Sequence, residues 1–168
     1  MASGSIIDRS QFNRQTILLV EDNDDDVFIM QNTFRRSGIP NPLQVVSDGE
    51  QAIDYLKGTG PYSDREKYPL PVILLLDLNM PKKNGFELLQ WIREQPDLKR
   101  TTVHIFSASS RTVDVERAFD LGANAYLVKP SKVEALIEMV KAWHSLAQFN
   151  LFPALEGPAI DPDPPRRK

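Results

Sequence analysis

Acidic, hydroxyl and lysine side chains stand directly after short apolar runs of this chain. In chain order they are Glu21-Asp22, Asp77, Ser107 and Lys129. One such residue alone is weak evidence, because every buried strand must end in something polar. Here, four of the five apolar runs end in this way, which indicates one site. Parallel strands bring their carboxyl ends to the same edge of the sheet, and ligands bind at that edge.

The acids among these residues predict a site for a divalent cation. If the first and third strands are neighbours, Glu21, Asp22 and Asp77 lie close together. Crowded carboxylates raise one another's pKa values, and a hard cation such as Mg²⁺ relieves their repulsion. We expect Asp22 and Asp77 to bind Mg²⁺ directly, together with the backbone carbonyl of Asn79. Glu21, which has the longer side chain, would act through a water molecule.

A metal-bound carboxylate that faces a lysine and a hydroxyl is suited to receive a phosphoryl group. Asp77 would be the nucleophile. Mg²⁺ and Lys129 would offset the charge on the phosphoryl oxygens. Ser107 would donate a hydrogen bond to one of those oxygens after the transfer.

The elements that must position these residues alternate between strand and helix patterns. The run Val72–Leu76 is uninterrupted and rich in β-forming residues, as expected of a parallel strand buried on both faces. The alternation predicts an α/β fold of the flavodoxin-like kind, a doubly wound, five-stranded parallel sheet of order 2-1-3-4-5 with five helices. The expected strands are 16–20, 43–46, 72–76, 102–106 and 125–128.

The two ends of the chain differ from its middle. We expect residues 1–14 to be a flexible segment, residues 15–148 to form the domain, and residues 149–168 to form a C-terminal extension. The extension is apolar at first and then rich in proline, a composition typical of extended or disordered chain. Its apolar side chains could form a homodimer contact, which we favour, or fold back onto the same chain. They are Phe149, Leu151, Phe152 and Leu155.

Composition argues against several classes of protein. With a formal net charge of −3, the chain has no basic excess to neutralise the phosphates of nucleic acid. The sequence contains no run of about 18 apolar residues, which a membrane span would need, and it shows no secretory signal pattern. The lack of cysteine excludes a disulfide scaffold and thiolate metal sites, and it fits a cytoplasmic protein.

From about Thr16 to Gln148, the chain resembles the receiver domain of two-component response regulators. The resemblance implies a single-domain regulator in which Asp77 accepts phosphate from a sensor histidine kinase, and which signals through protein contacts. It rests on motifs whose order and spacing agree with the family, namely Leu18–Asp22, Leu75–Pro81 with Gly85, Phe106–Ala108 and Gly122–Pro130.

The resemblance implies roles for further residues. Tyr126 would be the aromatic switch that follows Ser107 inward. The Lys129–Pro130 peptide bond would be cis and would help to aim the lysine. Asn79 and Ser109 would flank the water molecule that slowly removes the phosphoryl group.

The connection over residues 59–70 and the segment 81–85 resemble the branch associated with bacterial phytochromes, which implies a bacteriophytochrome kinase as partner. Ile29 could dock a kinase helix or simply pack in the core. Two other functions are a pseudo-receiver scaffold, against which the intact site residues count, and an aspartate-based phosphatase. Such a phosphatase normally carries a second acid where this chain has Asn79.

Overall fold

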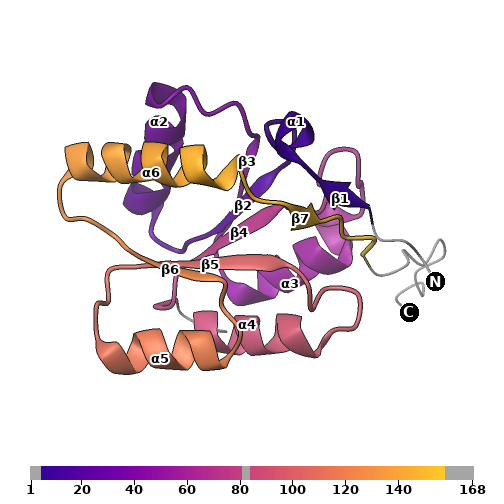
Figure 1. Cartoon of the computed structure of the whole chain (residues 1–168). Coiled ribbons are helices and arrows are strands. Elements are labelled where there is room, and N and C mark those ends of the chain that lie inside the picture. The colour runs from indigo at the N-terminus through magenta and orange to yellow at the C-terminus, as the bar shows by residue number, and fades with distance from the viewer. Residues whose placement is uncertain (1–4, 81–83, 158–168) are drawn as a thin grey trace.

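A five-stranded parallel sheet forms the centre of the computed structural model, which describes residues 5–80 and 84–157 (Figure 1). Its strand order is β3-β2-β4-β5-β6, since β1 (Ile6–Ile7) belongs to a separate small sheet. When the five strands of the large sheet are numbered in chain order, this is the predicted order 2-1-3-4-5, which is thus confirmed. All neighbouring strands of this sheet are parallel. The strands are β2 (Ile17–Val20), β3 (Leu43–Val46), β4 (Ile73–Leu76), β5 (Thr102–Ser107) and β6 (Ala125–Val128).

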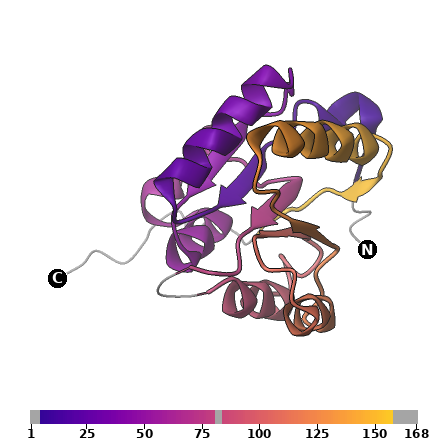
Figure 2. The same ribbon diagram turned by 90° about the vertical axis from the view of Figure 1, so that its left-hand side faces the viewer.

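Helices cover both faces of the sheet, which confirms the doubly wound arrangement (Figure 1, Figure 2). One face carries α2 (Asp24–Arg36) and α6 (Val133–Ala147). The other face carries α3 (Gly49–Lys57), α4 (Gly85–Glu94) and α5 (Thr112–Asp120). Among the described residues, no helix has both the length and the apolar character needed to cross a membrane.

Alternate side chains of the central strands enter two separate hydrophobic cores. Leu18, Leu74 and Leu76 belong to the core beneath α3 and α4, whereas Ile17 and Leu19 belong to the core beneath α2 and α6. Strands whose side chains are buried on both faces appear in the sequence as continuous apolar runs. The first polar residues after β2 and β4 therefore emerge together at the carboxyl edge of the sheet.

The two ends of the described chain are joined by a small unit that we call the terminal clasp, which consists of β1 (Ile6–Ile7), α1 (Arg9–Phe12) and β7 (Phe152–Pro153). Strand β1 pairs antiparallel with β7. Phe12 is completely buried, and its ring is stacked on that of Phe152 with the centroids 5.4 Å apart. The expectation of a flexible segment is therefore wrong for residues 5–14, and residues 1–4 lie outside the described residues.

The C-terminal extension is divided between buried and exposed side chains. Phe152 is 3% exposed and packs within its own chain, so its predicted role in a dimer contact is wrong and folding back is correct for this residue. Phe149 and Leu151 are 68% and 70% exposed, and Leu155 is half-buried. The remainder of the proline-rich stretch, residues 158–168, lies outside the described residues.

The connection between α3 and β4 is fastened by one arginine. The Arg65 guanidinium donates hydrogen bonds of 2.7 Å to the carbonyls of Tyr55 and Leu56, in the last turn of α3, and of 3.1 Å to that of Tyr68. A 3₁₀ turn, η1 (Gly60–Tyr62), brings the ring of Tyr62 against those of Tyr55 and Tyr68.

Candidate functional site

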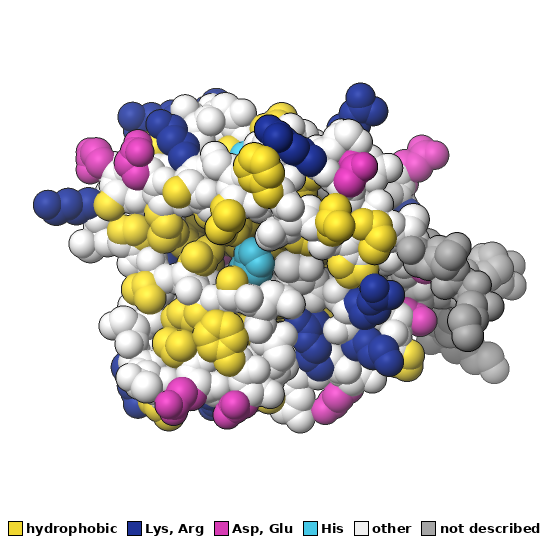
Figure 3. Space-filling view, in the orientation of Figure 1, with side chains coloured by type: hydrophobic (Ala, Val, Ile, Leu, Met, Phe, Trp, Pro, Cys, Tyr) yellow, Lys and Arg dark blue, Asp and Glu magenta, His cyan; other side chains and the backbone are white. Residues whose placement is uncertain are grey.

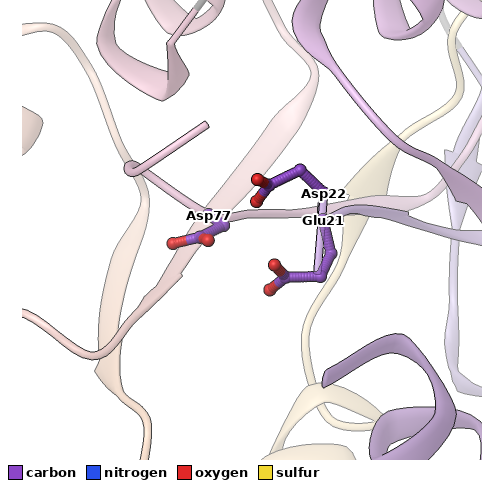
Figure 4. Close-up of side chains that lie close together, drawn as sticks. All are labelled: Glu21, Asp22 and Asp77. Carbon is purple, nitrogen blue, oxygen red and sulfur yellow. The ribbon is translucent and has the colours of Figure 1, made fainter. Parts of the chain in front are cut away.

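Three carboxylates lie together where β2 and β4 end (Figure 4). Val20 of β2 is paired with Leu76 of β4, so the residues that follow them, Glu21 and Asp77, leave the sheet at the same level. The Asp77 amide donates to the Val20 carbonyl at 3.1 Å. Oxygen atoms of Glu21, Asp22 and Asp77 all lie within 4.8 Å of one another, and the structure thus brings together the three acids that the sequence singles out.

The turn from β2 into α2 is held by two side chains. The Glu21 carboxylate accepts a hydrogen bond from the backbone N–H of Asn23 at 3.1 Å. The side chain of Asn23 in turn accepts from the Asp26 N–H at 2.9 Å and so caps α2. This short, fixed turn keeps Glu21 and Asp22 beside the end of β4.

Burial makes negative charge costly at two of the three acids. Glu21 is 2% exposed and Asp77 is 6% exposed, whereas Asp22 is half-buried. Burial raises the pKa of Asp77 more than the nearby charge of Lys129 lowers it. The pKa of Glu21 is raised to about 7, mainly by burial. The hydrogen bond from Lys129 lowers this pKa, and the charge of Asp77 raises it. Close, poorly solvated carboxylate oxygens of this kind fit a hard divalent cation.

The amine of Lys129 lies against these acids. Its Nζ forms a hydrogen-bonded ion pair with Glu21 and lies 3.2 Å from Asp26 and 3.7 Å from Asp77. Burial lowers the pKa of Lys129, but the hydrogen bond to Glu21 and the charge of Asp77 outweigh burial, so the pKa is raised. The lysine therefore stays charged and partly offsets the charges of the acids.

The Lys129–Pro130 peptide bond is trans, so the expected cis bond is wrong: no cis peptide bond occurs in the described residues. The Lys129 N–H donates to the Ser107 carbonyl at 2.8 Å, which fixes the backbone where β6 ends. From this position the side chain reaches the acids with the bond in its trans form, which is about 0.5–1 kcal/mol more stable than cis before proline.

Ser107 at the end of β5 and Tyr126 of β6 both contact Ser109, in the loop that follows β5. Ser107 is fully buried, and its Oγ accepts a hydrogen bond from the Ser109 N–H at 3.2 Å. The Tyr126 hydroxyl donates to the Ser109 carbonyl at 2.9 Å, so the proposed switch residue contacts the backbone of this loop. The Ser109 hydroxyl donates to Asp114 of α5 at 2.5 Å, which the sequence did not lead us to expect.

The loop after β4 packs directly against the start of α4. The backbone N–H of Asn79 donates to the Asp77 carboxylate at 3.4 Å, while the Asn79 side chain is exposed. A side chain at Gly85 would place its Cβ only 2.4 Å from the Asp77 carbonyl oxygen. Glycine at this position therefore allows the start of α4 to approach Asp77 closely.

Two residues at the site were missed by reasoning from the sequence. Asp26, one of three aspartates in the first turn of α2, contacts Lys129, and Asp114 contacts Ser109. Acidic residues are common in the first turn of a helix, where they favour the positive end of its dipole. Neither contact can therefore be predicted from the local sequence pattern. Asp26 and Lys129 are, in addition, 103 residues apart.

This fold, with acids, a lysine and a buried hydroxyl at one sheet edge, is that of a receiver. The family model described as the response regulator receiver domain matches residues 17–141, and the chain belongs to this family. It is a response regulator, as its motifs predicted.

Its relatives include regulators from light-sensing systems. Response regulator Rcp1 of Synechocystis sp. is 38% identical over 131 residues, which cover 78% of this chain and 87% of Rcp1. The crystal structure of a response regulator in red light signalling of R. palustris has a TM-score of 0.79 at 35% identity, covering 83% of this chain and 99% of that one. The phosphorylated cyanobacterial phytochrome response regulator RcpA has a TM-score of 0.74 at 35% identity, covering 82% and 98%. The Mn²⁺-bound form of Rcp1 has a TM-score of 0.70 at 36% identity, covering 86% and 99%.

Proposed function

We propose that this response regulator accepts a phosphoryl group on Asp77 from a sensor histidine kinase. The observation that carries the proposal is the meeting of three acids and one lysine at a single sheet edge. Oxygen atoms of the acids lie within 4.8 Å of one another, and the Lys129 amine lies 3.7 Å from the Asp77 carboxylate. A nucleophile, a fixed positive charge and oxygen ligands for a cation are what phosphoryl transfer to a carboxylate needs.

In the transfer, a carboxylate oxygen of Asp77 attacks the phosphorus of a phosphohistidine on the kinase. The O–P bond to Asp77 forms as the P–N bond to the imidazole breaks, and the departing nitrogen keeps the electron pair and takes up a proton. Lys129 offsets the charge on the phosphoryl oxygens. Ser107 donates its hydroxyl to one of these oxygens and draws the loop after β5 inward, and Tyr126 follows as the switch.

We propose that the cation is Mg²⁺. Asp22, Asp77 and the backbone carbonyl of Asn79 would hold it directly, and Glu21 would do so through a water molecule. When bound, the ion supplies positive charge that offsets the charges of the acids and of the phosphoryl group. The raised pKa values of Asp77 and Glu21 support a cation at this position. The Mn²⁺-bound form of the relative Rcp1 supports a divalent ion.

The proposed kinase is a bacteriophytochrome, because one relative acts in red light signalling and another is a phytochrome response regulator. An apolar surface beside the site suits a helix of such a partner. Ile29 is half-buried and lines a cavity of about 400 Å³ next to Lys129. Phe28, one residue earlier on α2, is 65% exposed.

The decisive experiment measures the uptake of one phosphoryl group. The chain is incubated with Mg²⁺ and acetyl phosphate, and its intact mass is followed. We expect a single phosphoryl group that is stable in acid and labile in base, absent in Asp77→Asn and present in the control Asp120→Asn, which changes an exposed aspartate at the end of α5. Uptake by the Asp77→Asn chain would refute the assignment, and no uptake by the unmodified chain would favour a pseudo-receiver scaffold.

The output of the regulator is proposed to be a contact with other proteins, including a second copy of this chain. Phe149 and Leu151 remain exposed candidates for the dimer contact, and Leu155, which is half-buried, remains a third. Figure 3 shows further apolar side chains over α5 and α6 on one face of the molecule. Exposed apolar residues of these two helices include Phe119, which is 49% exposed, and Leu146, which is 70% exposed.

The dimer is tested by light scattering. Phe149→Ser with Leu151→Ser changes exposed side chains and keeps the buried Phe152 of the terminal clasp. We expect the dimeric mass of the unmodified chain to fall to that of a monomer. An unchanged mass would remove these two residues from the contact.

A further inference from the structure

A cavity of about 410 Å³ lies between strand β6 and helix α6. Strand β6 forms one edge of the large sheet, and in the described chain it pairs only with β5. Small side chains leave this space open, since Ala125 lines it from β6, and Ala142 and Ala147 line it from α6. Apolar side chains gather over α6 on the face of the molecule that Figure 3 shows.

The lining of this cavity is largely apolar and carries no ionised side chain. Its walls include Leu127, Met139 and Trp143, which are half-buried. None of the described aspartate, glutamate, lysine or arginine residues lines it. Asn124 and Asn150, which have polar side chains, are exposed and so lie where the cavity meets solvent. The inner part therefore favours an apolar occupant.

One polar group of the inner wall has no hydrogen-bond partner. His104 of β5 lines the cavity and is 8% exposed, and its Nδ1 accepts the indole N–H of Trp143 at 2.9 Å. A neutral imidazole that accepts at one nitrogen carries its proton on the other, so the Nε2–H of His104 is a donor. Within the described residues Nε2 donates to no group, and it is not among the polar atoms that are sealed from solvent without a partner.

The direction of this donor is fixed, and water satisfies it poorly. The rings of His104 and Trp143 meet edge to face at 80°, with their centroids 6.1 Å apart. A buried water molecule usually makes about three hydrogen bonds. The inner side chains offer it only the His104 Nε2–H, because the Trp143 indole N–H is already bonded. A molecule that brings one acceptor and covers the apolar wall pairs with this donor at less cost.

We propose that the cavity between β6 and α6 binds a small, uncharged aromatic molecule that accepts a hydrogen bond from the His104 Nε2–H. An aromatic ring suits Trp143 and the Met139 sulfur, because rings pack well against other rings and against thioethers. Carboxylates, phosphates and amines are disfavoured, because a charge buried without a partner is costly. The volume lies within the range of roughly 300–1,000 Å³ that is usual for small-molecule sites.

The proposed site is separate from the acids at the carboxyl edge of the sheet. Neither these acids nor Lys129 line the cavity. The inference therefore does not rest on the proposed phosphoryl chemistry, and either proposal can fail without the other.

The test adds acetophenone, an uncharged aromatic molecule with one carbonyl acceptor, to the full chain at neutral pH. Nitrogen–proton NMR spectra follow the indole N–H of Trp143 and the Nε2–H of His104. Both signals should shift and saturate with a dissociation constant on the order of 1 mM, as expected of so small a ligand. The indole of Trp91, on α4 at the other face of the sheet, is the internal control and should not shift.

Benzoate and benzylamine resemble acetophenone in shape but carry a charge. Each should bind at least about tenfold more weakly than acetophenone, because no opposite charge lines the cavity. Equal affinities for the three compounds would overturn the proposal, since the cavity would then select neither an uncharged ligand nor its acceptor.

Three substitutions locate the site. Ala142→Phe should raise the dissociation constant of acetophenone at least about tenfold, because the new ring occupies the cavity. Ser145→Phe adds the same ring at an exposed position of α6 outside the lining and should leave the constant unchanged. His104→Phe removes the donor and should raise the constant about three- to tenfold, the usual contribution of one neutral hydrogen bond. Equal binding by the Ala142→Phe and Ser145→Phe chains would place acetophenone elsewhere and overturn the proposal.

The unmodified chain gives a check that does not depend on the folding of His104→Phe. A shift at the Trp143 indole without one at the His104 Nε2–H would refute the hydrogen bond, and no shift at either would refute the site. An affinity for acetophenone that falls as the chain concentration rises would mean that a second copy of the chain covers the cavity, which would also overturn the proposal.

Discussion

His104 should make the stability of the fold depend on pH. The residue lies on β5 and is 8% exposed. Trp143 of α6 donates its indole N–H to the His104 Nδ1 at 2.9 Å, so this nitrogen is an acceptor and the imidazole is neutral. Burial lowers the pKa of His104 from 6.5 to about 4.

The sign follows from proton binding in the two states. Between pH 6.5 and about pH 4, His104 of the unfolded chain binds a proton that the folded chain does not bind, so acid favours unfolding. The difference between the two pKa values, 6.5 and about 4, is worth about 3.5 kcal/mol at roughly 1.4 kcal/mol per pKa unit. About 2 kcal/mol of this should already be lost at about pH 5.

The assay is urea unfolding of the unmodified chain and of His104→Gln, whose side chain does not titrate, at about pH 7.5 and about pH 5. Burial also lowers the pKa of His144, so the quantity compared is the difference between the two chains. Acidification should reduce the free energy of unfolding of the unmodified chain by about 2 kcal/mol more than that of the variant. A difference independent of pH would contradict the assigned role of His104.

Three further results are expected. Phe152→Ala should lower the free energy of unfolding by about 3–5 kcal/mol, because its ring is buried against Phe12, whereas the exposed Leu151→Ala should change it by less than about 0.5 kcal/mol in the same urea titration. Mg²⁺ at about a hundred times its dissociation constant should stabilise the chain against urea by about 2.7 kcal/mol relative to EDTA, and Asp22→Asn should remove most of this gain. Lys129→Met should slow phosphoryl uptake from acetyl phosphate by at least about tenfold, measured by intact mass, because the cation that offsets phosphoryl charge is lost; an unchanged rate would exclude that role.

The strand ends of this fold are predictable because the pattern that defines them is local. Apolar runs buried on both faces stop abruptly at Glu21 and Asp77, and parallel pairing then brings the two acids to one level. The helix start at Asn23 is predictable for the same reason, since a capping residue acts within its own turn.

Contacts between distant segments leave no such local pattern. Ile7 near the start of the chain is paired with Phe152 near its end. A strand of two residues is too short to show the alternation of apolar and polar residues by which strands are predicted. Asp114 and Ser109 are only five residues apart, yet acids in the first turn of a helix usually serve the helix alone. The sequence therefore predicts the candidate site at the carboxyl edge of the sheet better than the long-range contacts that stabilise the fold around it.

The fastening of the α3–β4 connection by Arg65 changes what that segment offers to other molecules. Its length and polar composition suggest an easy target for proteases, but its arginine binds three backbone carbonyls and its tyrosine rings pack against one another. Because the segment is fastened in this way, it does not readily enter the active site of a protease that acts on the native protein. A protein that binds to this segment contacts a surface that is already ordered, so little conformational entropy is lost on association.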